Sequence, residues 1–231
     1  MNIVLLGHGK TGALVADVAR ERGHDVRVLR SADNVSAQAL YSGAAADADV
    51  VIDFTTPHVV LANIEACARA GKNMVVGTTG WYGELPRVRE MIERAGTGFV
   101  FGANFSVGVN VFFEVARSAA AALKLGYTGQ IMERHHIHKK DAPSGTALLL
   151  KRSMEQAGFA RAIDVSATRA GFIPGTHTVG FDGPAETITL THTARDRTAF
   201  ARGALTAAKW VHGKRGWFTM RDVLGVQEGR P

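Results

Sequence analysis

Near its start the chain reads Asn2-Ile3-Val4-Leu5-Leu6-Gly7-His8-Gly9-Lys10-Thr11-Gly12. Residues 2–6 form a short apolar run, which is typical of a buried parallel strand. Gly7, Gly9 and Gly12 then form the pattern G-x-G-x-x-G, and helical spacing follows over residues 13–21. In this pattern the first glycine makes a tight turn, the second lets a pyrophosphate approach, and the third lets helix and strand pack closely. We therefore predict that Gly7 to Gly12 bind a dinucleotide; a purely structural turn is the alternative.

Four more apolar runs follow, and we interpret each as a strand: residues 24–29, 49–54, 73–77 and 98–101. Helical spacing lies between them over residues 59–70 and 85–94. Strands that alternate with helices predict a parallel sheet covered by helices on both faces. The fold class expected from this pattern is therefore a Rossmann-type, doubly wound α/β fold.

The alternation stops after residue 106. From there the pattern predicts helices over 109–125 and 144–157, and strands over 128–134, 175–181 and 186–192. A last helix over 198–211 and a short strand over 217–220 end the chain's regular structure. We expect two domains: a dinucleotide-binding domain of residues 1–105 plus 197–231, and an inserted α+β domain of residues 106–196.

The end of the second predicted strand bears on the choice of cofactor. A dinucleotide site that binds the ribose 2′-hydroxyl usually has an acidic residue there, but this chain has Leu29-Arg30-Ser31. Arg30 can pair with a 2′-phosphate, which favours NADPH over NADH. The alternative is a solvated arginine, with Asp33 in the role of the acid.

Two further turns are candidates for cofactor binding. Gly77-Thr78-Thr79 and Gly102-Ala103-Asn104-Phe105 follow the fourth and fifth predicted strands. The carboxyl ends of strands in an open α/β sheet face the ligand crevice. We therefore predict that both turns line the nicotinamide side, with ordinary strand-to-helix turns as the alternative.

The densest group of reactive side chains lies at residues 133–147, which read Glu133-Arg134-His135-His136-Ile137-His138-Lys139-Lys140-Asp141-Ala142-Pro143-Ser144-Gly145-Thr146-Ala147. Cationic side chains before a helix N-terminus suit carboxylates or phosphates, and histidines can transfer a proton near neutral pH. Ser144 does not lie in the G-x-S-x-G motif of a nucleophilic serine. Serine is a favoured N-cap, so we predict that Ser144 caps the helix and contacts a ligand. No metal site is predicted, since the histidines lack the i, i+4 spacing of a helical pair and no thiolate is near.

The composition narrows the class of protein. The chain has 231 residues, of which 46% are hydrophobic and 21% charged, as in ordinary globular proteins. Cys67 is the only cysteine, so an internal disulfide is excluded. We see no signal peptide or membrane-spanning run and expect a cytoplasmic protein. The net charge of +6 suits anionic ligands. The basic residues are spread along the chain, so we do not expect nucleic acid or a membrane as a partner.

Several motifs together resemble the 4-hydroxy-tetrahydrodipicolinate reductase (dihydrodipicolinate reductase) family. Its signature, E-[IV]-x-E-x-H-x-x-x-K-x-D-x-P-S-G-T-A, matches residues 130–147 except at Gln130, where the family has Glu. The likeness continues through VVIDFT, VVGTTG, GANFSVGVNV and WFTMRDVL, and so spans nearly the whole chain. The chain departs from the family in its short glycine loop and in its shorter segment between Arg30 and Asp49.

The resemblance implies a Rossmann-type domain and an inserted domain that binds substrate and forms a homotetramer through its sheet. It implies reduction of a cyclic, unsaturated imine dicarboxylate to tetrahydrodipicolinate by NADPH or NADH, in diaminopimelate and lysine biosynthesis. By matching positions, His135 is the proton donor and acceptor and Lys139 a second donor. Substrate contacts are expected at His136, Ser144, Gly145 and Thr146. This chemistry is consistent, because charge that develops on the reduced ring needs a nearby cation and an acid.

Some roles stay open at the level of sequence. Asp141 and Glu133 are predicted to orient Lys139 or His135, and His177 is interpreted as a satisfied residue of a sheet. Two other functions are also open: a nucleotide-binding module of the same fold without turnover, and a Rossmann dehydrogenase for another anionic imine or keto acid.

Overall fold

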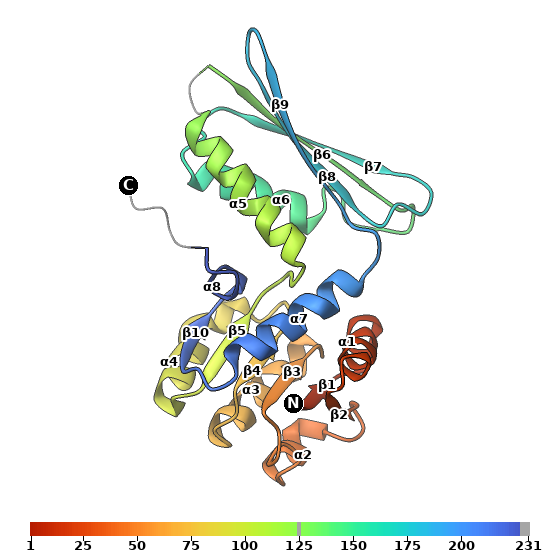
Figure 1. Cartoon of the computed structure of the whole chain (residues 1–231), viewed down its shortest axis with the longest axis vertical. Coiled ribbons are helices and arrows are strands. Elements are labelled where there is room, and N and C mark those ends of the chain that lie inside the picture. The colour runs from red at the N-terminus through yellow and green to blue at the C-terminus, as the bar shows by residue number, and fades with distance from the viewer. Residues whose placement is uncertain (124–125, 227–231) are drawn as a thin grey trace. The chain divides into compact units, whose positions relative to one another are not determined.

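A computed structural model gives the fold and describes residues 1–123 and 126–226 (Figure 1). The chain divides into two compact units. The first unit contains Met1–Val107 and residues 197–226, and the second contains Gly108–Asp196, of which 124–125 are not described. Among the described residues, no helix has the length and hydropathy needed to cross a bilayer.

The first unit is built on one parallel sheet. Its elements are β1 (Asn2–Leu6), α1 (Lys10–Glu21), β2 (Asp25–Leu29), a 3-10 turn (Val35–Ala37), α2 (Gln38–Tyr41), β3 (Val50–Asp53), α3 (Pro57–Arg69), β4 (Met74–Val76), a second 3-10 turn (Tyr82–Glu84), α4 (Leu85–Ala95), β5 (Gly98–Phe101), α7 (Thr198–Val211), β10 (Gly216–Phe218) and α8 (Met220–Val223). Within the described chain the strand order is β10-β5-β4-β3-β1-β2, and every pair is parallel. The predicted doubly wound sheet is confirmed. Its order reverses between β1 and β3, which is where ligands bind in such sheets.

Alternate residues of β1 build two separate cores. Ile3 and Leu5 pack on one face of the sheet, in a core shared with α1 and α7. Val4 and Leu6 pack on the other face, in a core shared with α2, α3 and α4. Successive side chains of a strand point to opposite faces, so a strand buried on both sides needs an uninterrupted apolar run. This explains why the apolar run of residues 2–6 predicted a buried strand.

One helix of this unit packs at unusually close range. Gly203 of α7 lies against the backbone of Phe105, and a Cβ added to Gly203 would lie 1.6 Å from the carbonyl oxygen of Phe105. We expect Gly203→Ala to lower the free energy of unfolding by about 1–3 kcal/mol or more, because the helix must move away from the chain at Phe105. Urea unfolding of the variant measures the loss.

Gly83→Ala is the matched control for that experiment. A Cβ at Gly83 meets nothing within 4 Å, so the free energy of unfolding should change by no more than about 0.5 kcal/mol. Equal losses in the two variants would contradict the close-packing argument.

The second unit is an α+β layer. Its elements are α5 (Val107–Ala122), β6 (Thr128–His135), α6 (Gly145–Gln156), β7 (Ile163–Arg169), β8 (Thr176–Asp182) and β9 (Thr187–Thr193). The strand order is β7-β6-β8-β9; β6 and β7 are parallel, and the other pairs are antiparallel. Figure 1 shows α5 and α6 against one face of this sheet, where they bury Ile131, Val179 and Phe181.

Burial alternates along β6 and separates two kinds of residue. Ile131, Glu133 and His135 are buried, whereas Met132 and Arg134 between them are exposed. A period of two on a half-buried strand places the first set on the helix-covered face. The reactive residues of β6 therefore share a face with the core of the second unit.

Several details differ from the elements expected from sequence, and the short helix α2 is one that was not predicted. β7 was not predicted, because it is an edge strand in which most side chains are exposed. The closing strand ends at Phe218 rather than 220, since Thr219 and Asp222 form a capping box that starts α8 at Met220. Helix α5 is described to Ala122, and the predicted end at 125 lies outside the described residues.

Candidate active site

The glycine loop between β1 and α1 satisfies the steric demands of its motif. Gly7 has φ = 92°, and a Cβ there would lie 2.4 Å from the carbonyl oxygen of Phe54. A Cβ at Gly12 would lie 2.5 Å from the carbonyl oxygen of Gly7. Gly9 is the N-cap of α1, and a Cβ added to it would have no heavy atom within 4 Å. The first and third glycines are therefore needed by the fold, and the second leaves open backbone at a helix N-terminus.

Two adjoining pockets of the first unit run along this loop and share Gly9, Phe54 and Thr55. The larger, of about 490 Å³, is lined at one end by Arg30 and Ser31. The smaller, of about 290 Å³, is lined by Lys10, Thr11, Gly12, Gly77, Thr78 and Thr79. His8 lies in the wall of the larger pocket. The structure thus brings together the predicted cofactor residues of the glycine loop, the β2 end and the β4 end.

The turn after β5 is not part of either pocket wall. Gly102 follows β5 and donates its N–H to the carbonyl oxygen of Val76 at 3.2 Å, and Ala103 is exposed. The side chain of Asn104 accepts the Ser106 N–H at 2.8 Å. Phe105 is buried in the core, with its ring edge-on to that of Phe54 at 6.1 Å. The side chain of Phe105 therefore serves packing, and its predicted cofactor contact stays a prediction.

Asp33 is engaged in its own turn beside Arg30. Its carboxylate accepts the Arg30 N–H at 2.9 Å, and its N–H donates to the Arg30 carbonyl oxygen at 2.9 Å. The side chain of Arg30 is exposed and lines the larger pocket. The end of β2 therefore presents a positive charge rather than a carboxylate to the pocket.

Asp53, at the end of β3, organises the crevice and was missed by the sequence analysis. It is fully buried and accepts hydrogen bonds from the Thr55 N–H at 2.9 Å, the Thr78 hydroxyl at 2.6 Å and the Asn63 amide at 2.8 Å. Burial raises the pKa of Asp53, although these bonds oppose the shift. The carboxyl ties the ends of β3 and β4 together, so it fixes Thr55 and Thr78 at the pocket wall.

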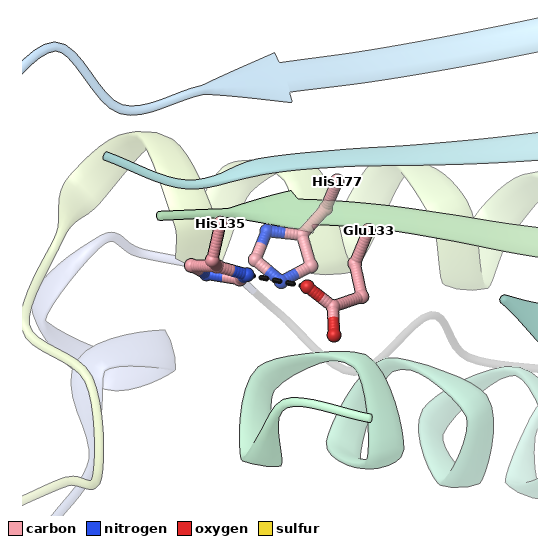
Figure 2. Close-up of side chains that lie close together, drawn as sticks. All are labelled: Glu133, His135 and His177. Atoms are coloured by element: carbon pink, nitrogen blue, oxygen red, sulfur yellow. Dashed lines mark hydrogen bonds and ion pairs between the residues drawn. The ribbon is translucent and has the colours of Figure 1, made fainter. Parts of the chain in front are cut away.

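In the second unit, one buried cluster gathers around Glu133 (Figure 2). Nδ1 of His135 bonds the Glu133 carboxylate, and Arg169 donates to both carboxylate oxygens, at 2.6 and 2.9 Å. The Ser144 N–H donates to the same carboxylate at 3.0 Å. His177 of β8 lies beside His135, with ring centroids 5.2 Å apart. Strand register explains the cluster, because Glu133 pairs with His177 and His135 with Arg169 across neighbouring strands.

The charges of this cluster are distributed unequally. Burial opposes ionisation of Glu133, but the hydrogen bonds from Arg169, His135 and Ser144 outweigh it and lower the pKa of Glu133. Burial lowers the pKa of His135, and the Glu133 carboxylate opposes that shift. Burial lowers the pKa of His177 to about 4. At neutral pH the cluster therefore holds an ionised Glu133, a neutral His177 and an imidazole at His135 that can exchange a proton.

The start of α6 is joined to the same cluster through Ser144. The Ser144 hydroxyl caps the helix by accepting the Ala147 N–H at 3.2 Å, and it bonds Nε2 of His177 at 3.1 Å. Ser144 is buried and its amide is bonded to Glu133. The Ser144 amide, which was predicted to contact substrate, therefore donates to Glu133 instead in this structure. Exposed Gly145 and half-buried Thr146 are the accessible part of the helix start, although the Gly145 N–H donates to the Asp141 carboxylate at 3.4 Å.

Lys139 and His136 lie in the turn that follows β6. The Lys139 ammonium donates to both oxygens of Asp141, at 2.7 and 2.9 Å, which is the contact that the predicted orienting role of Asp141 requires. An ammonium has three donors, so one has no partner within residues 1–123 and 126–226. Nδ1 of His136 is buried and has no hydrogen-bond partner among the described residues. The exposed ring of His138 lies 6.2 Å from that of His136.

Ligand atoms of Glu133, His135 and His177 all lie within 4.8 Å of one another, which is close enough to hold a metal ion. Both oxygens of Glu133, however, already accept the Arg169 guanidinium. A metal ion bound to Glu133 would have to displace the Arg169 guanidinium or lie beside its positive charge, which is unfavourable. We therefore assign no metal to this cluster. The absence of a metal stays a prediction.

Three residues of this cluster were missed from sequence: Arg169, His177 as a partner of Ser144, and Gly175. The alternation of Ile163, Val165 and Ala167 with polar residues was a signal for β7 and hence for Arg169. A Cβ at Gly175 would lie 3.0 Å from Nε2 of His135. Only glycine therefore leaves this nitrogen uncrowded.

Comparison with known proteins agrees with the fold and shows the family. Residues 1–105 match the family model "Dihydrodipicolinate reductase, N-terminus", and residues 108–224 match "Dihydrodipicolinate reductase, C-terminus". The 4-hydroxy-tetrahydrodipicolinate reductase of Christiangramia forsetii is 36% identical over 237 residues, which cover 97% of this chain and 98% of that protein. The one of Thiobacillus denitrificans is 41% identical over 211 residues, which cover 83% and 77%.

The fold is also found in a solved structure. Dihydrodipicolinate reductase from Paenisporosarcina sp. TG-14, solved with dipicolinate bound, is similar with a TM-score of 0.84 at 20% identity, covering 96% of this chain and 98% of that one. The two family models leave only a few residues of the chain unmatched. The chain therefore belongs to the dihydrodipicolinate reductase family.

Proposed function

We propose that this protein reduces 4-hydroxy-tetrahydrodipicolinate, via dihydrodipicolinate, to tetrahydrodipicolinate with NAD(P)H, in diaminopimelate and lysine biosynthesis. The carrying observation is the cluster at the end of β6. It couples a proton-exchanging His135 to an ionised Glu133, next to Lys139 and an accessible helix start. This arrangement suits a small anionic substrate that must be protonated during reduction.

The cofactor fits the first unit on steric and chemical grounds. Open backbone at Gly9, the helix start at Lys10 and the cation Arg30 match a pyrophosphate and a ribose phosphate. The residues that would hold NAD(P)H line the two pockets: Gly7 to Gly12, Arg30 and Gly77 to Thr79. Contacts of Gly102 to Phe105 with the cofactor stay a prediction. When bound, NAD(P)H supplies the hydride of the reaction.

The second unit supplies the remaining steps. One substrate carboxylate binds at Gly145 and Thr146, where the amides of a helix N-terminus favour an anion; it would replace the long bond of 3.4 Å from the Gly145 N–H to the Asp141 carboxylate. The half-buried ring of His136, in the turn after β6, offers a further polar contact. The 4-hydroxy substrate first loses water to give dihydrodipicolinate. Lys139 then stabilises the negative charge that develops on the conjugated ring nitrogen, and His135 gives its Nε2 proton to the ring carbon next to the one that receives the hydride, so the C=N bond is kept. The product leaves with one added hydrogen from each of two sources, and His135 regains its proton from water.

A single assay separates this function from its rivals. Purified protein is mixed with NADPH and freshly made substrate, and the absorbance of the reduced nicotinamide is followed. The reductase consumes NADPH; a binding module without turnover binds it with no loss of absorbance. A panel of other cyclic imines and keto acids separates the proposed reductase from a dehydrogenase of different specificity.

We further propose that NADPH is used in preference to NADH, since Arg30 faces the pocket where an acid would select a 2′-hydroxyl. Arg30→Ala should raise the KM for NADPH about tenfold and leave that for NADH unchanged, because one charge-assisted bond to the 2′-phosphate is lost. Steady-state kinetics with both cofactors measure this.

The control for that change is Arg22→Ala, an exposed arginine outside both pockets. It should alter neither KM. If Arg30→Ala weakens both cofactors equally, the arginine contributes only general charge and the preference argument fails.

We also propose a homotetramer formed through the uncovered face of the second sheet. Ser166, Met132, Thr178 and Thr191 form an uncharged row across its four strands, in register. Met132 is 42% exposed there. Light scattering after size exclusion tests this assembly, and Met132→Lys should dissociate it, because burying an unpaired ammonium is costly.

Cytoplasmic location stays a prediction, to be tested by fractionation.

A further inference from the structure

The Glu133 carboxylate, called the hub below, accepts two hydrogen bonds on each of its two oxygens. One oxygen accepts Arg169 at 2.6 Å and the Ser144 N–H at 3.0 Å. The other accepts Arg169 at 2.9 Å and Nδ1 of His135. The side chain of Glu133 is fully buried and that of His135 is 10% exposed. A buried carboxylate with four donors is held in one place, and so are the groups that donate to it.

This geometry determines which nitrogen of His135 reacts. An ionised carboxylate only accepts hydrogen bonds, so Nδ1 of His135 must carry its proton toward Glu133. Nε2 is left as the nitrogen that can gain or lose a proton. Gly175 keeps the space beside that nitrogen open. The tautomer and the direction of proton transfer are thus set by protein contacts.

Arg169 extends the hub to the other catalytic elements. Its guanidinium bonds the Asp141 carbonyl oxygen at 2.5 Å, and the Asp141 carboxylate holds Lys139. Through Ser144, the same carboxylate also fixes the start of α6. A single buried ion pair therefore connects the acid, the cation and the anion-binding helix start.

We propose that Glu133 and Arg169 are positioning residues, which together hold His135 in the tautomer that presents Nε2 and join it to the start of α6. The proposal rests on the reductase function above, because it assigns His135 the proton transfer. It goes beyond that function by giving a role to Arg169, which lies 34 positions further along the chain than His135 and on another strand.

The charges around His135 make the two partners act in opposite directions. The groups that face it are Glu133 on β6, Arg169 on β7, His177 on β8 and Lys139 in the following turn. Burial lowers the pKa of His135, Glu133 raises it, and Lys139 and Arg169 lower it. His177 stays neutral, because burial keeps its pKa at about 4.

The test is a proton NMR titration of the His135 ring in the protein without substrate, with the resonance assigned by its loss in His135→Gln. In Glu133→Gln the stabilising negative charge is gone, so His135 should bind its proton about tenfold more weakly. In Arg169→Gln the carboxylate loses its counter-charge, so His135 should bind its proton more tightly. Opposite displacements are the expected result.

The pH dependence of kcat follows with a definite sign. The protonated form of His135 donates, and its fraction falls as the pH rises through its pKa. The decline of kcat at high pH should therefore begin at lower pH in Glu133→Gln and at higher pH in Arg169→Gln. A merely structural role would lower kcat without moving this limb.

Two further variants keep the test decisive. Glu93→Gln removes an exposed carboxylate that pairs with Arg89 at 2.8 Å, and should leave the titration of His135 unchanged. If a single variant does not fold, the double variant Glu133→Gln/Arg169→Gln removes both charges and leaves two amides that can bond each other. His135 should then titrate between the two single-variant extremes.

The proposal is overturned if folded variants titrate at His135 as the wild type does, or if both single variants move it in the same direction. Because the titration needs no substrate, this outcome is separate from the function. A wild-type protein that fails to oxidise NADPH would refute the reductase alone, whereas an active enzyme with an unmoved His135 would refute the positioning pair alone.

Discussion

Replacing His135 with glutamine is expected to lower kcat by about 10²- to 10⁴-fold, the usual contribution of a positioned general acid. Glutamine keeps a hydrogen-bonding group near Glu133 but has no nitrogen that titrates. The Kd for NADPH should not change, since the cofactor crevice is built from the first unit and His135 belongs to the second. Steady-state kinetics and a fluorescence titration of NADPH measure the two effects.

His138→Gln is the matched control, because this histidine is exposed in the same segment. It should retain wild-type kcat. If His135→Gln also retains it, His135 has no part in the mechanism. A large loss of NADPH affinity in His135→Gln would mean that the substitution disturbs the fold.

Lys139→Ala is expected to lower kcat/KM for the dicarboxylate by about 10²- to 10³-fold, through a higher KM and a lower kcat together. The ammonium has a third donor beyond the two that bond Asp141, and it can interact with substrate both before and during the reaction. An interaction made in both states affects binding and rate. Kinetics at varied substrate concentration separate the two parameters.

The Tm should hardly change in this variant. Lys139 and Asp141 are 23% and 56% exposed, and an exposed ion pair contributes about 0–1 kcal/mol. Lys140→Ala removes the neighbouring exposed charge and should keep normal kinetics. An effect of Lys139→Ala confined to thermal stability would exclude Lys139 from the reaction.

The parts that could be predicted from sequence share a local cause. Residues 2–6 signal a strand buried on both faces, because both faces demand apolar side chains. Gly7 and Gly12 could be predicted to form the loop, because the tight turn from strand to helix leaves no room for a Cβ at either position. Ser144 is readable as a helix cap because its hydroxyl bonds an amide only three residues away.

The parts that could not be predicted depend on residues far apart in the chain. The alternating pattern of residues 163–167 could have indicated β7, but the meeting of Arg169 with Glu133 depends on the parallel register of β6 and β7. His177 meets Ser144 only because β8 pairs with β6. Asp53 gathers Thr78 and Asn63 because β3 and β4 are neighbours and α3 begins beside them.

The order of residues along this chain is therefore enough to specify the doubly wound sheet, the glycine loop and the candidate acid and cation, since each follows from local backbone sterics, hydrophobic period or motif. The tertiary structure alone assigns the partners of the buried charges. Strand register is a long-range property, and it determines that Glu133 receives a guanidinium, an imidazole and an amide at once.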